Sequence, residues 1–114
     1  MSGAAPEVFA WLAAAEASEA RGDRAAAQEL FLRVLRKDPA SVAGRLGFAR
    51  QLIARGMLAE AAAQLRRAVR AAPAHAAAHG LLGSVLHRLG DVAGAAAALT
   101  TAIPLQPDHL PAYL

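Results

Sequence analysis

A repeat with a period of 34 residues constrains the fold of this chain more than any other feature of its sequence. Each copy has, at the same spacing, a glycine, an alanine, two apolar residues of varying size and a closing proline. The three sets are Gly22, Ala27, Phe31, Val34 and Pro39; Gly56, Ala61, Leu65, Ala68 and Pro73; and Gly90, Ala95, Leu99, Ala102 and Pro107. Self-similarity at one period indicates a stack of equal units, each of which buries its apolar face against the next.

These landmarks resemble those of the tetratricopeptide repeat. A unit of that family has Trp, Leu-Gly and Tyr in its first helix, then Ala, Phe and Ala in its second helix and a closing Pro. Here Trp11 stands early in the first copy and Leu82 and Gly83 stand in the third, and the resemblance covers Val8 to His109. It implies an all-α fold, a right-handed α-solenoid of three helix–turn–helix repeats with an incomplete C-terminal capping segment. It also implies a non-enzymatic scaffold for protein–protein interaction.

The repeat register divides the chain into a short tail, one domain and the start of a further segment. Residues 1–7 form the predicted disordered tail, residues 8–109 the domain, and residues 110–114 the start of a capping or following helix. The repeats span 8–41, 42–75 and 76–109. We expect helices over about residues 7–21, 24–37, 41–55, 58–72 and 76–89. A sixth helix begins near residue 92 and should end before Pro104, because proline lacks a backbone donor.

Local residues also predict how the helices begin. The side chains of Asp and Ser accept hydrogen bonds from the free N–H groups of a first helical turn, which makes Asp23, Ser41 and Asp91 the predicted caps. Met57 stands where the other two copies have a capping Asp. The helix that follows Met57 should therefore be less stable by roughly 1 kcal/mol.

Composition and charge limit the functions that the chain can have. A chain of 114 residues without cysteine has room for one domain and offers neither disulfides nor thiolate metal ligands. There is no basic and then apolar leader, and no run of about 18 apolar residues, so we expect a cytoplasmic protein that does not enter membranes. The net charge is +3, and the excess belongs to the middle repeat, where six arginines face only Glu60.

The sequence contains no set of residues suited to catalysis, a cofactor or a metal. None of the serines lies in a nucleophile motif, and no glycine-rich loop precedes a basic residue that could hold phosphate. His75 and His79 have the four-residue spacing of metal ligands on a helix, but no acidic residue or cysteine nearby in the sequence completes a coordination shell. We therefore expect that the protein is not an enzyme and binds neither a cofactor nor a metal.

The best candidate site is the groove that the resemblance implies. In this family the first helix of each unit lines a concave surface that holds a peptide or helix of a partner protein. The inward positions of these helices combine apolar residues with acid at one end and base further on, which suits an amphipathic segment. The candidate groove residues are Phe9, Leu12, Glu16, Glu19, Leu46, Arg50, Ile53, Leu81, Ser84, His87 and Arg88. Alternatively, some of the leucines belong to the core.

This sequence does not match one subtype of the family. The carboxylate clamp, which grips the C-termini of heat-shock chaperones, needs Lys, Asn and Arg at defined places in the first helices. Those places hold Leu12, Glu16, Gly47, Ala77 and Leu81 in this chain. The resemblance therefore does not imply clamp activity.

Three further hypotheses stay open. The first is that the chain is the targeting or regulatory module of a longer bacterial enzyme, such as a transferase or hydroxylase. The second is that the chain binds nucleic acid through the arginines of the middle repeat. This hypothesis is disfavoured, because no aromatic residues are interleaved with the arginines for base stacking. The third is that the chain forms a homo-oligomer through its C-terminal end, where an apolar helix face would lack a covering helix. The residues expected on that face are Ala95, Ala98, Leu99 and Ala102, with Ile103 and Leu105 just beyond.

Overall fold

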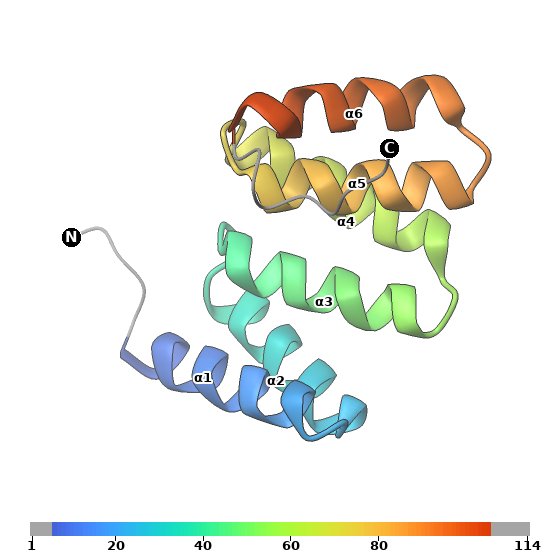
Figure 1. Ribbon diagram of the computed structural model, residues 1–114. Helices are drawn as coiled ribbons and strands as arrows, with labels where there is room; N and C mark the ends of the chain where they lie inside the picture. Colours follow the sequence, from blue (N-terminus) through green and yellow to red (C-terminus); the bar gives the residue numbers. More distant parts are fainter. Residues whose placement is uncertain (1–5, 106–114) are drawn as a thin grey trace.

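The computed structural model describes residues 6–105, and these form six α-helices (Figure 1). The helices are α1 Pro6–Ala20, α2 Arg24–Lys37, α3 Val42–Ala54, α4 Leu58–Ala71, α5 Ala76–Arg88 and α6 Val92–Leu105. No strand occurs in this part of the chain. Because α1 packs on α2, α3 on α4 and α5 on α6, the predicted all-α array of three helix–turn–helix units is confirmed.

The turn inside each unit is built in the same way three times. Gly22, Gly56 and Gly90 have φ angles of 79°, 77° and 88°, in the left-handed region that side chains with a Cβ rarely adopt. The residue after each glycine donates its backbone N–H to the carbonyl five residues earlier. The donor and acceptor pairs are Asp23 and Ser18, Met57 and Leu52, and Asp91 and Leu86. This bond closes a Schellman motif, as expected where a turn glycine ends a helix.

The helix starts follow the predicted caps, with one addition. The side chains of Asp23, Ser41 and Asp91 each accept a hydrogen bond of 2.9–3.2 Å from the backbone N–H three residues later. Met57 makes no side-chain cap, as predicted. The addition is His75, whose Nδ1 accepts the N–H of the residue three positions later at 3.2 Å and so caps α5.

Two helix ends differ from the predictions. Helix α1 begins at Pro6, so residues 6 and 7 belong to a helix and not to the tail. Proline is favoured at the first helical position, because the N–H that it lacks would have no helical partner there. Helix α6 continues past Pro104 to Leu105, so the expected stop before this proline is wrong. A proline in the last turn removes only one helical hydrogen bond. Residues 110–114, the predicted capping segment, lie outside the described residues.

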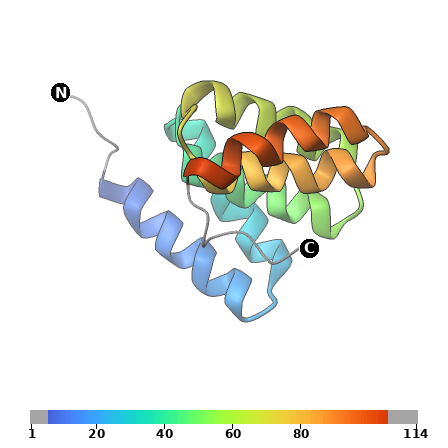
Figure 2. The ribbon, with the colours of Figure 1, turned by 45° about the horizontal axis from the view of Figure 1, so that its top comes forward.

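The three units stack in chain order. Helices α1, α3 and α5 lie one above the other across the view, with α2 and α4 behind them (Figure 1). A view turned by 45° again places α1 and α2 at one end and α5 and α6 at the other (Figure 2). The second helix of a unit also packs on the first helix of the next, α2 on α3 and α4 on α5, so the array is continuous.

The apolar core is divided unequally between the units. The larger cluster of buried residues joins the second and third units. Its members are Leu46, Ala49, Leu52, Ala61, Ala62, Leu65, Ala68, Ala78, Leu82, Val85, Leu86, Ala95 and Ala98. The first unit has a separate buried cluster of Ala15, Ala27 and Phe31. Since this second cluster is small, the first unit depends more strongly on its contacts with α3.

Two glycines of α3 receive the large side chains of α2. Phe31 is fully buried, and a Cβ placed on Gly47 would overlap three atoms of its ring. One turn earlier, a Cβ on Gly44 would stand 2.8 Å from Cγ1 of the buried Val34. The missing side chains on α3 therefore allow α2 to approach closely, and they fix the register between the first and second units.

Candidate functional site

The first helices of the three units, α1, α3 and α5, form one face of the molecule, here called the inner face (Figure 1). All eleven candidate groove residues belong to these helices. Five are exposed, five are half-buried and one is buried. The exposed residues are Phe9, Glu16, Ser84, His87 and Arg88; the half-buried residues are Leu12, Glu19, Arg50, Ile53 and Leu81; and the buried residue is Leu46.

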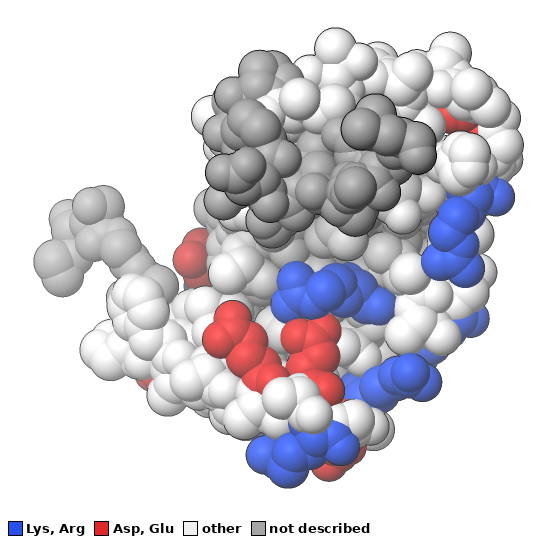
Figure 3. Space-filling view, viewed as in Figure 1, with Lys and Arg blue, Asp and Glu red and all other residues white. Residues whose placement is uncertain are grey.

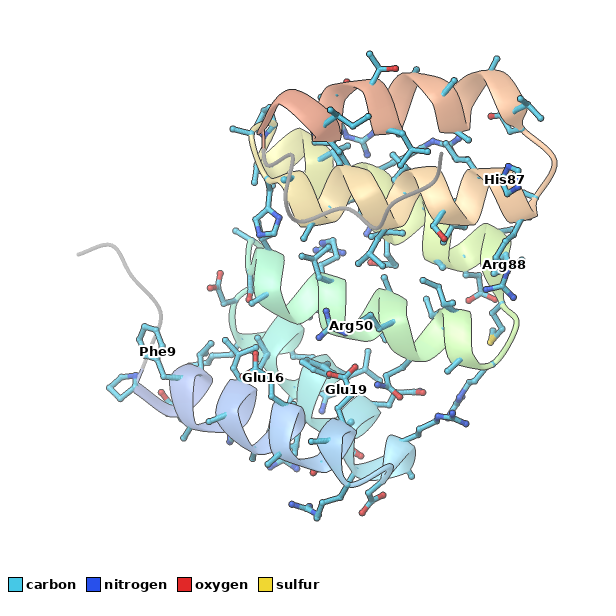
Figure 4. The ribbon with its side chains drawn as sticks, in the orientation of Figure 1. Phe9, Glu16, Glu19, Arg50, His87 and Arg88 are labelled. Atoms are coloured by element: carbon cyan, nitrogen blue, oxygen red, sulfur yellow. The ribbon has the colours of Figure 1, made fainter. Side chains whose placement is uncertain are left out.

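The charged candidates lie in two separate places (Figure 4). Glu16 and Glu19 point from α1 toward α3, where Arg50 lies. His87 and Arg88 lie at the far end of α5, well away from that group. The space-filling view of the same side shows acidic side chains of α1 meeting a basic side chain of α3 in a hollow between the two helices (Figure 3). The structure thus brings three of the charged candidates together and keeps the other two apart.

Leu46 is a core residue and not a groove residue. Its side chain is only 5% exposed and belongs to the larger buried cluster. Ile53 and Leu81, which are half-buried, also pack against that cluster. The assignment of Leu46 to the partner surface is therefore wrong. Helix α3 is rotated so that Gly47, and not Leu46, meets the first unit. Leu46 therefore packs within the larger buried cluster.

A polar cluster, here called the α1–α3 bridge, joins Glu19 to Arg50 and Gln51. Arg50 donates Nε to one carboxylate oxygen of Glu19 at 2.9 Å and Nη2 to the other at 3.1 Å. The Nε2 group of Gln51 donates a third hydrogen bond to Glu19, at 3.0 Å. This fork geometry is the strong, charge-assisted form of the Arg–carboxylate pair. Glu19 and Arg50 were predicted to bind a partner, whereas here they bind each other across two units.

The surroundings of the bridge hold Arg50 in place. Its guanidinium carbon lies 5.9 Å from the centre of the Phe31 ring, within the range of a cation–π contact. The side chains of Arg50 and Glu19 are 39% and 25% exposed, so the pair is partly shielded from water. Gln51 was not among the predicted site residues, because nothing local in the sequence indicates that its amide turns toward another unit.

Arg45, one of the six arginines of the middle repeat, is held by local partners. Arg45 donates to Oε1 of Gln64 and to the carbonyl of Pro39, each at 2.6 Å. Burial lowers the pKa of Arg45, and the nearby positive charge of Arg67 lowers it further. At the equivalent place in the first unit, Arg33 stacks on the ring of Trp11 at 5.6 Å. Arg33 and Arg45 therefore have local partners in this structure.

The two histidines with metal-ligand spacing have other partners. His75 caps α5, and Nε2 of His79 lies 2.8 Å from the carbonyl oxygen of Pro73. Across residues 6–105, no group of three or more His, Cys, Asp or Glu side chains is arranged to hold a metal ion. None of the helices described is long and apolar enough to cross a membrane.

The apolar face expected at the C-terminal end belongs to α6, and it packs against α5. Three of its four residues are buried, and the side chain of Leu99 would lie 2.8 Å from a Cβ on Gly83 of α5. For these four residues the expected exposure is wrong, because they close the third unit, whereas Ile103 just beyond them is exposed as expected. The residues concerned are Ala95, Ala98, Leu99 and Ala102. Among the described side chains of α6, Val92 and Ile103 are large, apolar and exposed. Self-association stays a prediction.

The fold defines the class of protein, an all-α helical-repeat protein of three stacked helix pairs. A family model described as tetratricopeptide repeat matches residues 46–109, more than half of the chain. The chain belongs to the tetratricopeptide repeat family. Among curated proteins, none matches the sequence.

Solved structures similar to this chain come from proteins of different kinds. The O-GlcNAc transferase of Thermobaculum terrenum has 31% identity and a TM-score of 0.86 over 90% of this chain and 20% of that chain. YrrB, described as a TPR protein with an unusual peptide-binding site, has 24% identity and a TM-score of 0.79 over 90% and 53%. The first TPR of Spaghetti, bound to an HSP90 peptide, has 14% identity and a TM-score of 0.86 over 93% and 86%. This chain thus spans about a fifth of the transferase and about half of YrrB.

Proposed function

We propose that this chain is a non-enzymatic protein-interaction scaffold whose inner face binds a peptide or helix of a partner protein. The observation that carries the proposal is the exposure of Phe9, which is 64% exposed on the inner face. Aromatic residues are enriched in protein interfaces, and an exposed one is therefore a candidate anchor for a partner. The peptide-binding site named for YrrB and the HSP90 peptide bound to Spaghetti support the same kind of activity here.

A peptide selection tests this proposal without knowledge of the natural partner. Peptides from a random displayed library are selected on the folded chain, and the affinity of a selected peptide is measured by calorimetry. The inner-face variant is Phe9→Ala, and the matched variant on the opposite side is Arg67→Glu. We avoid Leu46 and Arg50 as probes, because their substitution would disturb the core and the α1–α3 bridge.

The expected result is that Phe9→Ala weakens binding by about 1 kcal/mol or more, whereas Arg67→Glu leaves it unchanged. Truncating an aromatic side chain that anchors an interface has an effect of this size. If no peptide is selected, or if only Arg67→Glu weakens binding, the inner face is not the binding surface and the proposal fails.

A second candidate function is the targeting or regulatory module of a longer bacterial enzyme, such as a transferase or hydroxylase. The 31% identity to part of an O-GlcNAc transferase favours this candidate. The native reading frame tests it: a coding sequence that continues past Leu114 into an enzyme domain supports it, and a stop codon there contradicts it. A bacterial source and a cytoplasmic location belong to the same proposal.

A further inference from the structure

One carboxylate near the α1–α3 bridge has no partner in the described part of the chain. Both oxygens of Glu19 are occupied by Arg50, and Gln51 adds a third hydrogen bond. Glu16, three residues earlier on the same helix, is exposed and has no hydrogen bond or ion pair among residues 6–105. It points toward the same space between α1 and α3 (Figure 4). The free acceptor in this part of the inner face is therefore the carboxylate of Glu16.

The charges and hydrogen-bonding groups of this place favour a cation. Arg50 is neutralised by Glu19, so the three charged side chains together carry one negative charge. Gln51 is only 3% exposed, and its Oε1 has no donor in the described part of the chain. The amide cannot be turned over to satisfy this oxygen, because Oε1 would then face the carboxylate of Glu19. This oxygen is itself buried, so the acceptor that an incoming donor can reach is the exposed carboxylate of Glu16.

An exposed aromatic residue stands beside this acidic place. Phe9 lies seven residues before Glu16 on α1, two helical turns away on the same face. At 1.5 Å of rise per residue, the two backbone positions are about 10 Å apart along the helix. The phenyl ring and the carboxylate therefore offer an apolar contact and an acidic contact at a fixed separation.

We propose, building on the function proposed above, that the inner face between α1 and α3 recognises a partner segment that carries a lysine or arginine. The basic side chain binds Glu16, and an apolar side chain about 10 Å away contacts Phe9. In an extended segment this separation corresponds to about three residues, and in a helix to about seven. An acidic segment is disfavoured, since the nearest cation, Arg50, is already held by Glu19.

The selected peptides of the previous section provide the probe. We expect peptides selected on the unaltered chain to be enriched in lysine and arginine, with an apolar residue three or seven positions away. Glu16→Gln should weaken such a peptide by about fivefold, which corresponds to an exposed ion pair of about 1 kcal/mol. Selection on Glu16→Lys should instead enrich acidic peptides. Glu60→Gln, which removes an exposed carboxylate from the first turn of α4, is the matched control and should change nothing.

Two results separate this inference from the function on which it rests. If Phe9→Ala weakens the selected peptides but they carry no excess of basic residues and Glu16→Gln has no effect, the charge preference is wrong and the scaffold function stands. If neither inner-face substitution matters, or if no peptide is selected, the scaffold function itself fails. Circular dichroism of Glu16→Gln and Glu16→Lys checks that both variants keep the helical fold, as expected for an exposed position.

Discussion

The first unit and the two units that follow it are built alike but stabilised differently. The second and third units share one large buried cluster, whereas the first unit has a separate cluster of three fully buried residues. The first unit has a smaller core, but its junction with α3 is stabilised by the fit of Phe31 to Gly47 and by the hydrogen bonds of Glu19. The family model also begins only at Leu46. Equal helix geometry therefore does not imply equal stability along a repeat array.

The largest test of this comparison removes the main apolar side chain of the first unit. Phe31→Ala should cost about 3–5 kcal/mol, because the ring is fully buried. If the first unit depends on its junction, amide hydrogen exchange should rise in α1 and α2 while α3 to α6 stay protected. Leu65→Ala, the equivalent change in the second unit, should instead raise exchange across α3 to α6. Equal loss of protection in all six helices after Phe31→Ala would contradict the comparison.

A second prediction concerns the space on α3. Gly47→Ala places a methyl group where the Phe31 ring lies, and such crowding costs about 1–3 kcal/mol. The better helix propensity of alanine, worth about 1 kcal/mol, offsets only part of this cost. Phe31→Leu removes the crowded ring atoms, so the double variant should be more stable than the sum of the two single effects predicts. Additive effects in urea denaturation would mean that the two residues do not interact.

A third prediction separates a bridging ion pair from a surface pair. Glu19→Gln should lower the free energy of unfolding by about 1 kcal/mol, because it weakens the contacts to Arg50 and to the buried amide of Gln51. Glu29→Gln breaks the exposed 3.7 Å pair with Arg36 and should change stability by only a few tenths of a kcal/mol. Chemical denaturation at low and high salt measures both. Similar losses for the two variants would show that the bridge has no special role.

The smallest expected effect is a gain, and it lies in the second unit. Met57 precedes α4 without a cap, whereas Asp23 and Asp91 cap the corresponding helices. Met57→Asp should therefore stabilise the chain by about 0.5–1 kcal/mol. Thermal and urea unfolding provide the measurement, with Met57→Ala as the control that changes the side chain without adding an acceptor. A gain of the same size for Met57→Ala would exclude capping as its cause.

The fold could be predicted from the sequence because its determinants are local. A turn glycine and a capping Asp act within five residues, so a fixed spacing places every helix. Even the cap that was missed had a signal, since His75 stands 34 residues after the capping Ser41. This signal is easily overlooked, because histidine is not among the usual capping residues.

The candidate site could be predicted only in part, because it depends on how helices are rotated against each other. Leu46 and Gly47 are neighbours in sequence but point about 100° apart around the helix axis, so the rotation of α3 decides which of them faces the first unit. The pairing of Glu19 with Arg50 likewise joins residues 31 positions apart on different units. Side-chain type placed both residues on the inner face, but it could not indicate that they would neutralise each other.

The fit of Phe31 to Gly47 has a consequence for how such units can be combined. The second and third units hold Leu65 and Leu81 at the equivalent positions, and both residues belong to or pack against the larger cluster. One junction thus combines a large side chain with none, and the other combines two of medium size. If the first and third units were joined directly, Phe31 would meet Leu81 and overfill the space. The units are therefore not interchangeable parts, and their order in the chain is encoded in the volumes of the side chains that meet where they join.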